Sequence, residues 1–126
     1  MPVNFIKILS CAASGILLIV SALLPAMWVG MFVHAVRAWR FLGFWPSYDR
    51  PDPKDLPPWL VADTVEKVAV AGVFVLVASA GALALRKIGT PQKRVLAAAA
   101  ICAAAILVTF IVLSADPGGV FEWYVD

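Results

Sequence analysis

The sequence predicts an all-α integral membrane protein with three transmembrane helices, over approximately residues 5–36, 60–85 and 93–115. Three long runs without a charged residue predict the helices: Ile8–Val33, Val68–Leu85 and Val95–Ala115. Hydrophobic residues make up 63% of the chain and charged residues 14%, against roughly 45–50% and 25% in a soluble domain. No segment alternates apolar and polar residues over the length that a transmembrane β-strand needs.

The length of the chain, 126 residues, allows a single domain spanning residues 1–126. A soluble domain of this size buries about 60–70% of the surface of its unfolded chain. That fraction is too small to enclose so many apolar side chains. We therefore expect the lipid bilayer to cover the remainder.

The first predicted helix begins near residue 5 and contains a charge-free run of twenty-six residues. The apolar region of a signal peptide is only about 7–15 residues long, so we expect an uncleaved first span. Pro25 removes one backbone hydrogen bond and predicts a kink. Residues 27–39 either continue this helix or lie at the membrane interface, and we favour continuation.

A polar connection, residues 37–60, separates the first two predicted helices. It contains five prolines, which favour extended backbone in the residues that precede them. It is also rich in aromatic side chains, which settle at the depth of the lipid headgroups. The sequence therefore predicts a proline- and aromatic-rich loop that lies along the outer membrane surface.

The second and third predicted helices each match a hydrocarbon core about 30 Å thick, at a rise of 1.5 Å per residue. The second begins between Leu56 and Asp63, capped either by Asp55 or by an acidic capping box that starts at Asp63. Residues 86–94 are too few to recross the bilayer, so the two helices form an antiparallel hairpin. The third ends near Ser114, because residues 116–119 read Asp-Pro-Gly-Gly. The amphiphilic tail should rest on the same surface as the loop.

The distribution of charge predicts the topology. The amino terminus and the turn at residues 86–94 carry five cations and no acid, whereas the other side carries five cations and all eight acids. The positive-inside rule counts Lys and Arg and gives a tie. The tie is broken because the turn concentrates four cations in nine residues. We place the amino terminus in the cytoplasm, and loop 37–60 and the carboxyl terminus outside, in a bacterial inner membrane.

Small residues cluster near the cytoplasmic end of each span, at residues 10–15, 78–82 and 97–105. Such residues let helix backbones approach closely in lipid. The sequence therefore predicts a tight neck where the three helices meet. We expect Gly81 and Ala100 to lie within it.

One group of polar residues is the candidate binding site. His34, Arg37 and Arg40 recur every three residues, so they share one side of the first helix. They predict an anion or lipid-headgroup site at the outer interface, where Asp63 and Glu66 of the second helix could pair with the arginines. The alternative is that these cations only favour the negative end of the helix dipole and extend to water.

Other chemistries find no support in the sequence, and we expect no enzyme, cofactor, metal or nucleic-acid partner. A single histidine is too few for a zinc site. Asp49, Asp52 and Asp55 form a row that could attract calcium, but Arg50 and Lys54 are close enough to neutralise it. No nucleophile–base pair or phosphate-binding loop is present. The spans contain no ionisable group that could relay protons.

Three functions remain open from the sequence. The first is a non-catalytic membrane protein that packs against other membrane proteins or against a second copy of itself. The second is a ligand or lipid-headgroup binding module at the outer interface, built from the five residues named above. The third is an uncoupled channel or carrier formed by an oligomer, which lacks the polar stripe that such a pore would need.

Overall fold

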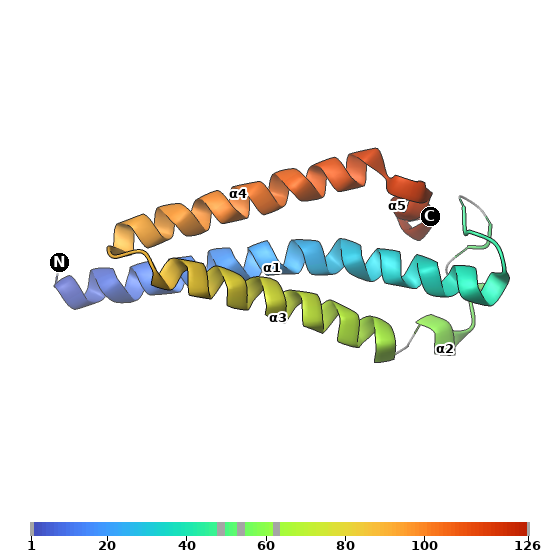
Figure 1. The fold of residues 1–126 in the computed structure, drawn as a ribbon, viewed down its shortest axis with the longest axis horizontal. Coiled ribbons are helices and arrows are strands. Elements are labelled where there is room, and N and C mark those ends of the chain that lie inside the picture. Colours follow the sequence, from blue (N-terminus) through green and yellow to red (C-terminus); the bar gives the residue numbers. More distant parts are fainter. Residues whose placement is uncertain (1, 48–49, 53–54, 62–63, 126) are drawn as a thin grey trace.

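The computed structural model describes residues 2–47, 50–52, 55–61 and 64–125. Three helical segments in this part of the chain are long and apolar enough to cross a membrane: Val3–Leu42, Pro58–Arg86 and Pro91–Ala115. Within the same residues there is no β-strand, only an isolated bridge between Ser47 and Arg50. The structure therefore confirms the predicted all-α class and its three membrane-length helices (Figure 1).

Helix α1 (Val3–Leu42) is continuous over 40 residues and passes through Pro25 without interruption. At 1.5 Å per residue it is about 60 Å long, roughly twice the thickness of a hydrocarbon core. It ends at Gly43, which adopts a left-handed conformation (φ 78°) and donates its N–H to the carbonyl of Trp39. The predicted continuation of the helix through residues 27–39 is confirmed. The helix ends later than predicted because nothing before Gly43 breaks it.

The second membrane-length segment consists of α2 (Pro58–Val61) and α3 (Thr64–Arg86). The predicted cap by Asp63 falls outside the described residues. Helix α4 (Pro91–Ala115) starts two residues before its predicted position. The Thr90 hydroxyl caps it by accepting the N–H of Lys93 at 3.4 Å, and Pro91 occupies the first turn, where a missing N–H costs nothing.

Asp116 both ends α4 and starts the tail. Its own backbone is left-handed (φ 39°), and its N–H bonds to the carbonyl of Val112. A short 3₁₀ turn, η2 (Pro117–Gly119), leads into α5 (Val120–Val125). The Asp116 carboxylate accepts the N–H groups of Phe121 (2.6 Å) and Glu122 (3.0 Å). The predicted end of the third long helix is confirmed, and the tail is helical.

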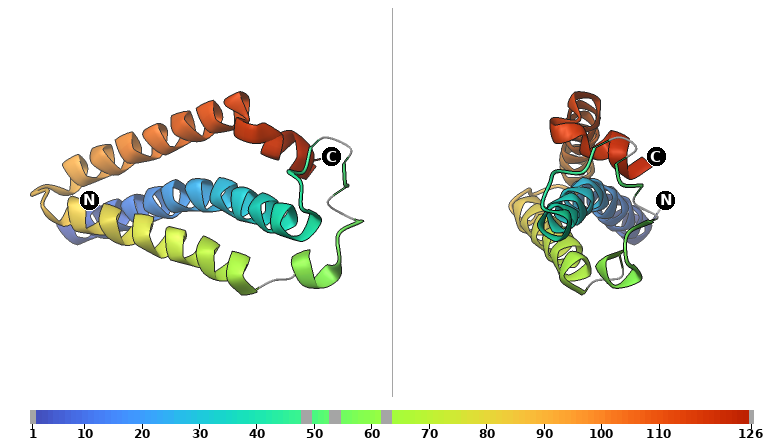
Figure 2. Two further views of the ribbon diagram at one scale, coloured as in Figure 1. Left: turned by 45° about the vertical axis from the view of Figure 1, so that its right-hand side comes forward. Right: turned by 90° about the vertical axis from the view of Figure 1, so that its right-hand side faces the viewer.

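Helix α1 is the centre of the arrangement. Helix α3 runs antiparallel to it, α4 runs parallel to it, and most interhelical contacts involve α1 rather than the α3–α4 pair. Figure 2 shows α3 and α4 on different sides of α1. The predicted antiparallel hairpin is present, but its two helices diverge from their shared turn.

The two ends of the molecule are formed by different elements. The turn end holds the amino terminus and the α3–α4 turn, and the loop end holds α2, α5 and the long connection (Figure 1). The hydrophobic core lies at the loop end, where Trp123 is fully buried. The buried residues of this core are Met31, Ala35, Ala38, Leu56, Leu60, Val120 and Trp123. Along α3, by contrast, only Leu85 is buried.

The turn end has the small-residue packing that the sequence predicted, with one correction. A Cβ atom on Gly81 would lie 2.7 Å from Cδ2 of Leu18, so the Leu18 side chain of α1 packs directly against Gly81 of α3. Ala98 and Cys102 of α4 are buried, whereas Ala100 is exposed. The placement of Ala100 in the neck was wrong, because two residues along a helix rotate a side chain by about 200° away from the packed face.

Two tryptophans tie the long connection to the tail. Trp45 Nε1 donates to the carbonyl of Gly118 at 2.8 Å, and Trp123 Nε1 donates to the carbonyl of Pro51 at 2.7 Å. Gly118 has φ 75°, and a Cβ there would approach the Trp45 ring at 3.3 Å. The tail therefore lies against the loop, and the expectation that both rest on the outer membrane surface stays a prediction.

Candidate functional site

His34 and Glu66 form the centre of the predicted site. Their Nδ1 and Oε2 atoms are 3.1 Å apart, and the two residues join α1 to α3. Because an ionised carboxylate only accepts hydrogen bonds, Nδ1 of His34 is the donor. The His34 side chain is buried and the Glu66 side chain is half-buried, with 4% and 18% of their surfaces exposed.

Two aromatic residues of α5 complete the surroundings of His34. The Trp123 ring stacks on the imidazole with centroids 5.6 Å apart and planes at 19°. Tyr124 meets the same imidazole edge-on, with centroids 5.8 Å apart. A side chain enclosed in this way has little surface left for a ligand. The His34–Glu66 pair therefore joins α1, α3 and α5 at the loop end.

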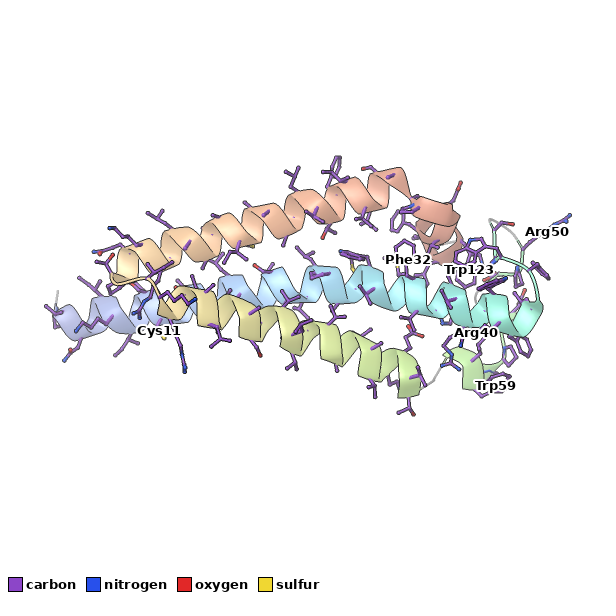
Figure 3. The ribbon with its side chains drawn as sticks, viewed as in Figure 1. Cys11, Phe32, Arg40, Arg50, Trp59 and Trp123 are labelled. Atoms are coloured by element: carbon purple, nitrogen blue, oxygen red, sulfur yellow. The ribbon has the colours of Figure 1, made fainter. Side chains whose placement is uncertain are left out.

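The two arginines of the predicted site line a separate groove. Arg37 is half-buried and Arg40 is exposed. The groove has a volume of about 440 Å³, and its other lining residues are Phe41, Trp59, Leu60 and Val65. Figure 3 shows Arg40 between α1 and α2, close to Trp59.

The structure therefore does not bring the five predicted residues together into one site. Within residues 2–47 and 64–125, the ion-pair partner of Glu66 is His34 and not an arginine. The structure places Arg37 and Arg40 together in the groove. Asp63 lies outside the described residues, so its predicted pairing with the arginines stays a prediction.

Sequence reasoning missed Trp123 and Tyr124 as partners of His34. The only signal was the aromatic tail, which was expected near the loop but not against the first helix. Sequence reasoning also used Lys7, Arg86 and Arg94 only to predict the membrane topology. These three cations line a pocket at the turn end, opposite the predicted site.

In the described part of the chain, no group of three or more His, Cys, Asp or Glu side chains is placed to hold a metal ion. The predicted aspartate row includes Asp49, which is outside that part. Comparison with known protein families, curated proteins and solved structures found no match to this chain. Functional proposals for the protein therefore rest on its own geometry.

Proposed function

We propose that the protein is a non-catalytic integral membrane protein that acts by packing against other transmembrane helices, with a second copy of the chain as its partner. Three helices of membrane length and high apolar content support a membrane location. The observation that carries the proposal is a face of small residues on α4 that packing within one chain does not use.

Helix α4 has two distinct faces of small residues. Ala98, Cys102 and Thr109 are buried, and α1 is the main neighbour of this helix. A second face, on the side of α4 away from these buried residues, stays exposed. It carries four alanines, Ala99, Ala100, Ala103 and Ala104.

The spacing of these alanines favours association of like helices. Positions four residues apart form the small-xxx-small pattern, which lets two backbones approach closely in lipid. Two copies inserted in one membrane share the same orientation. A two-fold axis along the membrane normal then places the same α4 face of each copy against the other.

The mass of the purified protein in mild detergent, measured by light scattering, tests this proposal. We expect a dimer for the wild type and a monomer for Ala100→Leu and Ala103→Leu, because leucine separates the backbones. The matched control is Ala84→Leu, an exposed alanine of α3, which should remain dimeric. A wild-type monomer at all protein concentrations would contradict the proposal.

We further propose a bacterial inner membrane location, with the turn end in the cytoplasm and the loop end outside. The five unopposed cations of the turn end support this orientation. Topology reporters fused after Gly89 should report the cytoplasm, and reporters fused after Asp126 should report the outside. Two reporters on the same side would reject the three-span arrangement.

The second candidate function is headgroup binding at the loop end, now restricted to the arginine groove. Its support is the groove of about 440 Å³ that Arg37 and Arg40 line beside the Phe41–Trp59 aromatic pair. In nanodiscs that contain phosphatidylglycerol, Arg40→Gln should reduce the number of retained anionic lipids. Arg50→Gln, which removes an exposed cation at the same end outside the groove, should not. Equal retention by both variants would reject this candidate.

A further inference from the structure

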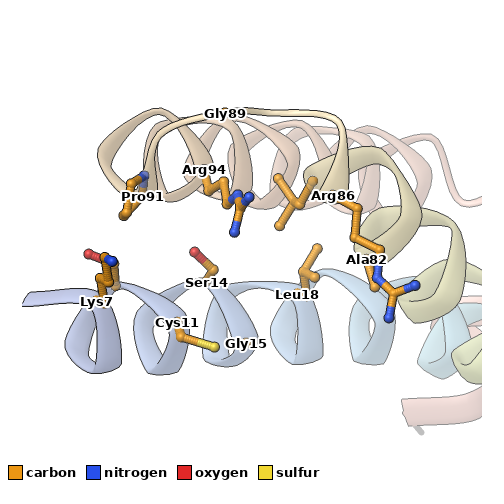
Figure 4. A pocket seen from close by; sticks show the side chains of 12 residues that line it. Lys7, Cys11, Ser14, Gly15, Leu18, Ala82, Arg86, Gly89, Pro91 and Arg94 are labelled. Carbon is orange, nitrogen blue, oxygen red and sulfur yellow. The ribbon is translucent and has the colours of Figure 1, made fainter. Parts of the chain in front are cut away.

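A pocket of about 550 Å³ lies at the turn end, between the start of α1, the end of α3 and the start of α4. Ser14, Gly15 and Leu18 of α1 form one wall, and Ala82 and Leu85 of α3 form another. Figure 4 shows the side chains that line the pocket.

Three cations from three helices line this pocket: Lys7, Arg86 and Arg94. Nε of Arg94 donates to the carbonyl of Ile88 at 2.7 Å, which fixes the side chain and leaves its two terminal amino groups for another acceptor. No acidic residue lines the pocket, and no ion pair to these cations is recorded for the described residues. These three cations are exposed, so a bound anion could accept hydrogen bonds from them without displacing an acidic partner.

Ser14 provides an independent observation. Its side chain is buried at 9% exposure, and its Oγ has no hydrogen-bond partner in the described structure. The comparable Ser21 on the same helix donates to the carbonyl of Leu17 at 2.7 Å. In Figure 4 the Ser14 hydroxyl points into the pocket toward the Arg94 guanidinium. An unpartnered buried hydroxyl is costly unless a ligand satisfies it.

We propose that this pocket binds the phosphate group of an anionic phospholipid. The cations and the Ser14 hydroxyl supply the donors that phosphate oxygens require. The pocket lies where the charge-free runs end, which is the depth of lipid headgroups. Leu18 on the α1 wall and Leu85 on the α3 wall supply apolar surface beside which acyl chains would lie. The site is separate from the α4 face, so it can be tested whether or not the protein dimerises.

Titration of the purified full-length protein with lipid, followed by native mass spectrometry, tests the assignment. We expect dioleoylphosphatidylglycerol to bind at least fivefold more tightly than dioleoylphosphatidylcholine. Lys7→Gln and Arg86→Gln should each weaken phosphatidylglycerol binding about fivefold. Lys87→Gln and Lys93→Gln remove cations at the same end that do not line the pocket, and they should leave the affinity unchanged.

Three results would overturn the proposal. Equal affinity for the two lipids would show that headgroup charge is not recognised. Equal losses from Lys7→Gln and Lys87→Gln would show that only the overall charge of the turn end matters. Saturable binding of inorganic phosphate that Lys7→Gln weakens, without binding of phosphatidylglycerol, would assign the pocket to a soluble anion.

Ser14→Ala separates a ligand contact from a structural role. Removing an unpartnered hydroxyl should leave the melting temperature in phosphatidylcholine nanodiscs unchanged or higher. The same substitution should weaken phosphatidylglycerol binding at least twofold. Ser79→Ala, at an exposed serine of α3, should change neither quantity. Unchanged lipid affinity in Ser14→Ala would remove this hydroxyl from the site and contradict the proposed geometry.

Discussion

The loop end and the turn end of the molecule are packed by different means. At the loop end, large side chains from α1, α2 and α5 form a closed core around Trp123, and indole and imidazole groups make specific hydrogen bonds. At the turn end, the Leu18 side chain of α1 packs against Gly81 of α3, and a pocket lined by three cations remains beside them. The loop end thus has a core of apolar side chains, whereas the turn end has a pocket lined by cations.

The difference in packing between the two ends follows from the length of α1. A helix of about 60 Å extends well beyond a hydrocarbon core of about 30 Å. In the proposed topology, the segment with Arg37 and Arg40 extends beyond the hydrocarbon core into water, where burial of apolar side chains drives packing. Helices inside lipid lack that driving force and rely on close approach of small residues. Substitutions at the two ends should therefore differ in effect.

The largest loss of stability should follow from Trp123→Ala. This substitution empties a fully buried site and removes the hydrogen bond to Pro51 and the stacking on His34. Large-to-small changes of this kind cost about 3–5 kcal/mol. The matched control is Trp59→Ala, whose side chain is 59% exposed and whose contact with Phe41 is worth about 0.5–1.5 kcal/mol. Equal shifts in denaturant midpoint for the two variants would refute a closed core at the loop end.

The next largest effect should come from the His34–Glu66 pair. Glu66→Gln weakens a charge-assisted hydrogen bond in a largely buried site, and such bonds are worth about 1.5–3 kcal/mol. A double-mutant cycle with His34→Gln should show a coupling energy of at least about 0.5 kcal/mol. Chemical denaturation in detergent measures the free energy of unfolding of the wild type, the two single variants and the double variant. Strict additivity would mean that the two side chains do not interact.

A smaller loss of stability is expected when a larger side chain is introduced at the turn end. Gly81→Leu forces a side chain against Leu18, and overpacking costs about 1–3 kcal/mol. Gly81→Ala should be milder, because its Cβ meets only the flexible end of the Leu18 side chain. Ala80→Leu places the same leucine on the adjacent exposed position and should leave the melting temperature nearly unchanged. If Gly81→Leu and Ala80→Leu melt alike, α1 and α3 are not in close contact at this depth.

Only part of the candidate site could be predicted from the sequence. The i, i+3 spacing correctly placed Arg37 and Arg40 together, because neighbouring turns of one helix fix that relation. It could not assign Glu66 to His34, since that choice depends on the register between α1 and α3. It also could not place Trp123 against His34, because the position of α5 depends on how Asp116 ends one helix and starts the next.

The sequence by itself determined the three membrane-length helices, the stop at Asp116 and the separation of charges between the two ends. These features depend on local properties: charge-free length, turn residues and composition. Only the tertiary structure decided that α1 is central, that Ala98 rather than Ala100 faces it, and that Lys7, Arg86 and Arg94 share one pocket. In a span that is apolar on every side, hydropathy does not mark the packed face. That face is chosen by the fit of small residues between helices, which exists only when the helices meet.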